Sequence, residues 1–245
     1  VRIKEYKQMV QGLHDAGMGE IMDVVYNHTY DGNSAFNRIV PYYYYRYTPT
    51  GANTSASGCG NDTASERYMF RKFMVDSVRY WASEYDLDGF RFDLMGLHDL
   101  QTMQEIEKAV HEVNPEALIY GEGWTMGATV DGSDQANQGN ISKITPHGIG
   151  AVAVFNDVIR DGLKGSTFDT LSTGFISGSY AANKLKIQFG INGGTGIAAT
   201  WNVKNQMSVN YMSAHDNHSL WDKLAISNPN DSVETRMAMN KLGAG

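Results

Sequence analysis

Three acidic side chains each follow a short hydrophobic segment of this 245-residue sequence. The acids are Asp93 after residues 87–92, Glu122 after residues 117–121 and Asp216 after residues 209–215. Helix-like stretches separate these segments, which is the pattern of parallel strands in an α/β protein. Because α/β barrels place their chemistry at the carboxyl ends of their strands, we expect the three acids to gather at one edge of a sheet.

The neighbours of the first two acids favour opposite protonation states. Strand alternation puts Arg91 on the same face as Asp93, and a guanidinium beside a carboxylate keeps that acid ionised, as a nucleophile requires. Glu122 stands between two glycines and beside Trp124, where partial loss of solvent favours the protonated form. One ionised and one protonated carboxyl group are the minimum for cleaving a glycosidic bond through a covalent intermediate.

The third acid has polar neighbours. Asp216 lies between His215 and Asn217, and both of these side chains form hydrogen bonds readily. We therefore expect Asp216 to stabilise developing positive charge and to help bind sugar hydroxyls.

Composition restricts the partners of the chain. The net charge of −7 and the pI near 5.4 argue against nucleic acid, which needs clustered Lys and Arg. No apolar run approaches the length of a membrane span. The only cysteine, Cys59, excludes an internal disulfide, so cysteine content does not indicate the cellular compartment. A secreted or cell-surface location is slightly preferred to a cytoplasmic one. The start at Val1, without methionine or leader, favours a cut inside a longer protein.

The order of the segments predicts a partial (β/α)₈ TIM barrel. Five strands are expected, near residues 21, 88, 118, 152 and 209. A closed barrel needs eight strands, so residues 1–245 are interpreted as one incomplete catalytic barrel domain, about five strands of eight. Residues 29–62, which include four consecutive tyrosines, predict a long loop excursion after the first strand. Residues 63–66 read as a capping box that starts the next helix and does nothing more.

Four short motifs resemble, in the same order, the regions that mark the α-amylase family of retaining glycoside hydrolases. They read DVVYNH at 23–28, GFRFDLMG at 89–96, YGEGW at 120–124 and SAHDN at 213–217. Their local sequence is similar to type I pullulanases, the bacterial starch-debranching enzymes, and the similarity runs from about residue 2 to residue 242. The signature Tyr-Asn-Trp-Gly-Tyr-Asp-Pro of that subgroup does not occur in this chain.

The resemblance implies roles for the residues of these motifs. Asp93 would be the nucleophile, Glu122 the acid/base and Asp216 the carboxylate that stabilises the transition state. The residues expected at the substrate are His28, Arg91, Leu94, Met95, Trp124, His215 and Asn217. No cofactor or metal is required by this chemistry. Asn27 occupies a position that ligates calcium in many amylases, so calcium stays open.

The implied reaction is hydrolysis of α-1,6-glucosidic branch linkages in pullulan, amylopectin and glycogen-type glucans. The partner would be a branched α-glucan, with no nucleic acid and no membrane. An α-1,4-acting amylase or neopullulanase and an isoamylase are the alternatives among enzymes. An inactive glycan-binding barrel is the alternative outside enzymes, and such proteins typically lose one of the acids. The presence of all three acids together with Arg91 favours an enzyme.

The strand count leads to a first prediction. Five strands cannot close a barrel, so the outer strands would present unpaired backbone groups and nearby helices would expose apolar surface. Residues 1–245 expressed by themselves are expected to self-associate and to leave pullulan uncleaved, with activity appearing once flanking strands are added. Analytical ultracentrifugation and a reducing-sugar assay measure both. A monomeric, cooperatively melting and active chain would contradict this expectation.

Overall fold

The computed structural model describes residues 1–127, 130–195 and 207–245. Its strands are β1 (Ile21–Val24), β2 (Gly89–Phe92), β3 (Leu118–Gly121), β4 (Ala153–Asn156) and β5 (Ser208–Asn210). They form one sheet in the order β1-β2-β3-β4-β5, and the first four are paired in parallel. This sequential parallel order is that of a β/α barrel, and the five predicted strands are confirmed.

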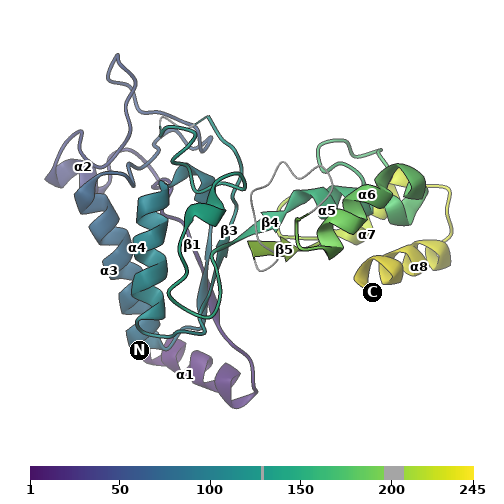
Figure 1. The fold of residues 1–245 in the computed structure, drawn as a ribbon, viewed down its shortest axis with the longest axis horizontal. Helices are drawn as coiled ribbons and strands as arrows, with labels where there is room; N and C mark the ends of the chain where they lie inside the picture. The colour runs from purple at the N-terminus through teal and green to yellow at the C-terminus, as the bar shows by residue number, and fades with distance from the viewer. Residues whose placement is uncertain (128–129, 196–206) are drawn as a thin grey trace. The chain divides into compact units, whose positions relative to one another are not determined.

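Helices connect and cover these strands (Figure 1). The α-helices are α1 (Arg2–Asp15), α2 (Ala35–Ile39), α3 (Tyr68–Tyr85), α4 (Leu100–His111), α5 (Asp157–Lys164), α6 (Tyr180–Ile191), α7 (Leu220–Ser227) and α8 (Val233–Ala244). Short 3-10 helices are η1 (Met95–Leu97), η2 (Ile141–Lys143) and η3 (Phe175–Ser177). No helix in the described part of the chain combines the length and the apolar composition that crossing a membrane requires.

The chain forms two compact units, residues 1–154 and residues 155–245. The first unit holds β1, β2, β3 and helices α1 to α4, and the second holds β5 and helices α5 to α8. The interpretation of residues 1–245 as one incomplete barrel domain stays a prediction.

The core of the first unit lies between the sheet and two long helices. Alternation along β2 sends Phe90 and Phe92 toward α3 and α4, and both rings are fully buried. α3 and α4 lie side by side against this face (Figure 1). Gly89 permits the close approach of β3, because a Cβ atom there would lie 2.3 Å from the carbonyl oxygen of Leu118. Because side chains alternate along β2, Arg91 lies on the face opposite Phe90 and Phe92.

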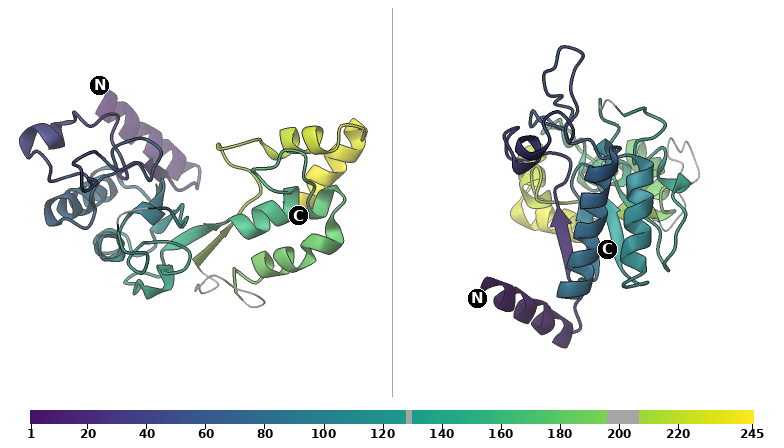
Figure 2. Two further views of the ribbon diagram at one scale, coloured as in Figure 1. Left: turned by 90° about the horizontal axis from the view of Figure 1, so that it is seen from above. Right: turned by 90° about the vertical axis from the view of Figure 1, so that its left-hand side faces the viewer.

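The connection between β1 and α3 is the expected long excursion. It stands at the carboxyl end of β1, opposite to α1 (Figure 2). Its two ends are bonded to each other: the amide of Thr63 donates to the carbonyl of Asn27 (2.9 Å), and Thr29 and Asn61 exchange two hydrogen bonds of 3.1 and 3.0 Å. The excursion therefore leaves and re-enters the barrel framework through adjacent residues.

The predicted capping box is wrong. α3 begins at Tyr68, and its N-cap residue, Arg67, forms no side-chain cap. The Thr63 hydroxyl donates instead to the carbonyl of Tyr26, and the Ser65 hydroxyl donates to Asp99 at 2.7 Å. Serine and threonine hydroxyls bind whichever backbone or side-chain group is nearest, so tertiary contacts replaced the local cap.

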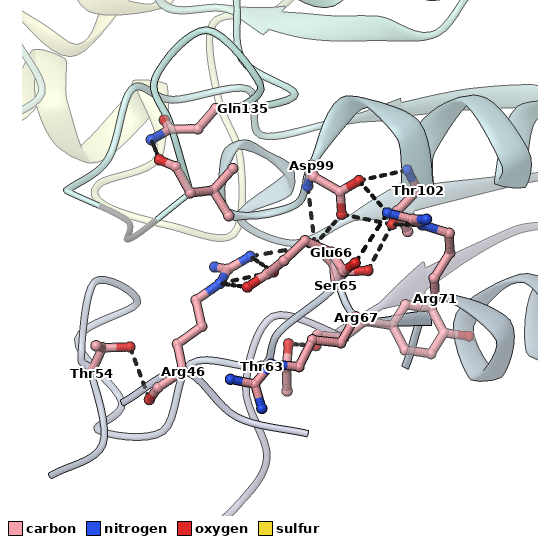
Figure 3. A network of polar contacts seen from close by, with 12 residues as sticks. Arg46, Thr54, Thr63, Ser65, Glu66, Arg67, Arg71, Asp99, Thr102 and Gln135 are labelled. Atoms are coloured by element: carbon pink, nitrogen blue, oxygen red, sulfur yellow. Dashed lines mark hydrogen bonds and ion pairs between the residues drawn. The ribbon is translucent and has the colours of Figure 1, made fainter. Parts of the chain in front are cut away.

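Asp99 joins the excursion to both long helices (Figure 3). Its buried carboxylate accepts from Ser65, from Arg71 of α3 (3.1 Å) and from the amide and hydroxyl of Thr102 in the first turn of α4. Burial by itself raises the pKa of Asp99, but the hydrogen bonds from Thr102 and Ser65 and the charge of Arg71 together hold it below its ordinary value.

This depressed pKa predicts a pH-dependent local stability. A carboxyl group whose pKa is lowered by folding stabilises the fold above its unfolded pKa, near 4, and loses that contribution as the pH falls. Asp99→Asn should therefore destabilise α4 by about 2 kcal/mol at neutral pH, with a smaller effect toward about pH 4. Hydrogen-exchange mass spectrometry on peptides from α4 measures this. Asp76→Asn, in an exposed pair with Lys72, is the control and should change little. A destabilisation independent of pH would contradict the assignment.

Candidate active site

Two of the predicted acids follow adjacent strands directly. Asp93 comes after β2 and Glu122 after β3. The amide of Asp93 donates to Val24 of β1, and that of Glu122 donates to Phe92 of β2, each at 3.0 Å. The hydrogen-bond ladder of the sheet thus extends to the acids themselves. Residues placed on a sheet in this way are held more rigidly than residues on loops.

One buried guanidinium contacts both acids. Arg91 Nη1 lies 3.0 Å from Asp93 Oδ1 and 2.8 Å from Asp23 Oδ1, and its Nη2 lies 3.1 Å from Glu122 Oε1. Burial by itself lowers the pKa of Arg91, but Asp23, Glu122 and Asp93 together raise it above its usual value. The predicted pairing of Arg91 with Asp93 is confirmed, and Arg91 holds Glu122 as well.

Asn27 and His28 complete the surroundings of Asp93. The amide nitrogen of Asn27 donates to Asp93 Oδ2 (2.9 Å) and to the Asp93 carbonyl (2.8 Å). The amide oxygen of Asn27 faces His28 Nδ1 at 2.6 Å. Because that oxygen can only accept, Nδ1 of His28 carries the proton and a neutral ring leaves Nε2 as the acceptor. Asp93 is thereby fixed through both carboxylate oxygens.

Glu122 is held by two donors. Its Oε1 contacts Arg91, and its Oε2 accepts from the backbone amide of Leu94 at 2.8 Å. The Glu122 side chain is 9% exposed, so the expected burial is confirmed. A cation and an amide donor both favour the charged form, however, and they oppose the effect of burial on which the expectation of a protonated acid rested.

One of the expected substrate contacts, Met95, is placed differently. Met95 is fully buried and packs on Gly121, so its predicted contact with substrate is a misassignment and its role is in the core. Trp124 is half-buried. Its carbonyl oxygen packs against Gly96, where a Cβ atom would lie only 2.0 Å from that oxygen. Leu94 is partly exposed beside both acids.

The second unit carries the third acid. β5 ends at Asn210, so Asp216 lies in the following loop and not at the end of the strand as predicted. Asp216, His215 and Asn217 are all exposed, and His215 Nε2 lies 3.6 Å from Asp216 Oδ1. Asn217 adopts a positive φ of 63°.

Two elements fix the position of this exposed loop. The amide of Leu220 donates to the Ser213 hydroxyl, and the buried ammonium of Lys164 donates to the carbonyl of His218 at 3.3 Å. Burial and the nearby Arg160 lower the pKa of Lys164. Each end of the loop is thus bonded to a neighbouring element of the second unit.

Sequence reasoning missed Asp23. It pairs in register with Arg91 across β1 and β2 and contacts it at 2.8 Å. An acidic residue inside an otherwise apolar strand was the available signal, because such a charge needs a partner on its own face of the sheet. Asn27 was weighed only as a calcium ligand, whereas the structure uses its amide to hold Asp93 and His28.

These contacts do not fit calcium at Asn27. The amide oxygen that would ligate the ion is engaged by His28. Among residues 1–127, 130–195 and 207–245 no cluster of three His, Cys, Asp or Glu side chains is arranged to hold a metal ion. No step below depends on calcium.

Comparison with known proteins identifies the family. No family model matches the chain. A pullulanase of Bacillus subtilis (strain 168) is 38% identical over 246 residues, which are 99% of this chain and 33% of that protein. A crystal structure of pullulanase from Paenibacillus barengoltzii, in complex with maltohexaose and α-cyclodextrin, is 42% identical with a TM-score of 0.94 and covers 99% of this chain and 37% of that one. The chain belongs to the pullulanase family.

A second pullulanase structure agrees. The type I pullulanase of Bacillus subtilis str. 168, complexed with maltose, is 36% identical with a TM-score of 0.92, covering 99% of this chain and 34% of that one. The α/β fold and the family expected from the four motifs are therefore confirmed. The chain spans about a third of the length of the curated pullulanase from Bacillus subtilis that it matches.

The shared guanidinium predicts that lysine cannot replace Arg91. A single ammonium lacks the planar array of donors that reaches three carboxylates, so Asp93 and Glu122 would shift relative to each other. In a protein of pullulanase length that carries residues 1–245 at the matching segment, called the full-length host below, Arg91→Lys should lower kcat/KM about 100-fold or more. Arg79→Lys is the matched control, because Arg79 pairs with Glu112 at the surface. Near-wild-type kinetics for Arg91→Lys would refute the clamp.

Proposed function

We propose that the protein carrying this segment is a retaining glycoside hydrolase that cleaves α-1,6-glucosidic branch linkages in pullulan, amylopectin and glycogen-type glucans. The observation that supports it is the pair of carboxyl groups, Asp93 and Glu122, on neighbouring strands and held by one guanidinium. The related structures are pullulanases, and two of them contain maltohexaose or maltose. No cofactor is needed in this proposal.

In the first step Asp93 attacks the anomeric carbon and Glu122 gives its proton to the departing glycosidic oxygen. The bond to the leaving sugar breaks as the bond to the Asp93 carboxylate forms. Water then attacks the glycosyl–enzyme ester, Glu122 takes the water proton, and Asp93 leaves as a carboxylate. Arg91 and Asn27, which contact the two carboxylate oxygens of Asp93, orient it for the attack and for its release.

The remaining residues are assigned to substrate binding and charge stabilisation. Asp216 would stabilise the oxocarbenium-like transition state, with His215 and Asn217 beside it. His28 would accept a hydrogen bond from a sugar hydroxyl at Nε2, since its Nδ1–H donates a hydrogen bond to Asn27 Oδ1. Trp124 would stack on a sugar ring, and the side chain of Leu94 would line the site beside the acids.

Hydrolysis of pullulan tests the reaction and its linkage. Cleavage of α-1,6 bonds by the full-length host should yield maltotriose. Cleavage of α-1,4 bonds would yield panose or isopanose and would assign an amylase or neopullulanase instead. Absence of products together with retained glucan binding would assign a glycan-binding barrel. Branched glycogen as a second substrate separates an isoamylase from a pullulanase.

The nucleophile assignment predicts a near-complete loss. Asp93→Asn in the full-length host should reduce turnover by more than about 1000-fold while branched-dextrin binding stays close to wild type. Asp131→Asn, an exposed loop position in the same unit, is the control. Proton NMR of the first-formed products should show retained anomeric configuration. A variant with a tenth of the wild-type activity, or inverted products, would overturn the assignment.

A further inference from the structure

Leu94 has a backbone conformation that its residue type disfavours. Its φ of 40° and ψ of 46° lie in the left-handed region, where the Cβ atom of an L-residue crowds the following carbonyl. Leucine has no side-chain group that could compensate by a local hydrogen bond, as asparagine does. Strained residues of this kind persist where the surrounding structure requires them and are concentrated at functional sites.

The requirement is visible in the contacts of the segment. Leu94 stands between the partly exposed carboxylate of Asp93 and the buried side chain of Met95. Its amide donates to Glu122 Oε2 at 2.8 Å, and the amide of Gly96 donates to the carbonyl of Glu122 at 2.9 Å. The left-handed turn thus folds the chain after the nucleophile back onto the acid/base residue.

We propose that Leu94 is a positioning residue that acts through its backbone: the left-handed turn aims its N–H at Glu122 and fixes the orientation of that carboxyl group. This inference rests on the proposed function, in which Glu122 is the acid/base. The Leu94 side chain is not the element that matters for this role. The turn couples the two acids, because the peptide that follows the nucleophile supplies the donor.

The charges around Glu122 define the expected pH effect. Arg91 contacts its other oxygen, Asp93 and Asp23 share that guanidinium, and Tyr120 precedes it on the same face of β3. An N–H donor favours the carboxylate over the protonated acid. Loss of the donor therefore favours the protonated form, and the basic limb of the pH profile, which reports the acid, moves to higher pH.

Three substitutions separate the backbone from the side chain. Leu94→Gly and Leu94→Asn remove the isobutyl group but keep the left-handed conformation accessible. Leu94→Val keeps an apolar side chain of similar kind, but a β-branched residue at positive φ is a severe outlier. If the role belongs to the backbone, Leu94→Gly and Leu94→Asn lose less activity than Leu94→Val. If a side-chain contact with sugar matters, Leu94→Val loses the least.

The experiment compares these variants in the full-length host on pullulan across pH. Leu94→Gly and Leu94→Asn should leave the basic limb in place and lose less kcat than Leu94→Val, because both keep the left-handed conformation accessible. Leu94→Val should lower kcat about tenfold or more and move the basic limb up by about one pH unit. A glycosyl fluoride substrate, which needs little proton donation, should show a much smaller loss for Leu94→Val.

The outcomes distinguish this inference from the function on which it rests. If Glu122→Gln keeps full activity on pullulan, the proposed function fails. If Glu122→Gln is inactive but Leu94→Gly and Leu94→Asn lose as much activity as Leu94→Val, the backbone role is overturned. That comparison holds even where Leu94→Val does not fold. An unchanged basic limb in folded Leu94→Val would also overturn the inference, and a crystal structure of this variant would show whether the amide has left Glu122.

Discussion

The guanidinium of Arg91 is the interaction on which the site of the first unit depends. It is buried and lies within 3.1 Å of carboxylate oxygens from three strands or strand ends. A buried cation without partners costs several kcal/mol, and a buried carboxylate such as that of Glu122 costs as much without a cation, so the two groups stabilise each other in the site. The carboxylates outnumber the cation. The resulting excess of negative charge suits the proposed reaction, which builds positive charge on a sugar ring.

The sheet explains why these groups can meet. β1, β2 and β3 each bring one carboxylate, and the pairing of Asp23 with Arg91 in register sets the height at which they converge. A shift of β2 by one residue would send Arg91 into the helix layer and Phe92 into the site. The buried rings of Phe90 and Phe92 prevent that shift, because they fill the space under α3 and α4. Packing on one face therefore protects the chemistry on the other.

Local patterns in the sequence were sufficient for the strands and for the placement of Asp93 and Glu122. Alternation in a four-residue strand determines which side chains share a face, and strand ends are visible as changes in hydrophobicity. Residues 63–66 were misinterpreted because their hydroxyl partners, Tyr26 and Asp99, are distant in sequence. The left-handed backbone of Leu94 was equally hidden, since leucine carries no propensity for it. Asp216 was predicted at a strand end because the strand-like sequence before it continues beyond Asn210, where β5 ends.

The closed ends of the excursion have a consequence for how such proteins can vary. Thr29 and Asn61 bond to each other, and Thr63 bonds to Asn27, so the two ends of the excursion meet at the framework. Phe36 and Tyr44 in its middle also pack on Phe70 of α3, which leaves the turn at residues 49–52 as an exposed part of the excursion. The entropic cost of lengthening a loop whose ends are already joined grows only slowly with its length. The exposed turn at residues 49–52 is therefore the part that can be extended or grafted from a relative while Asn27 and Asp93 keep their places, which makes it the natural position for engineering new surface contacts.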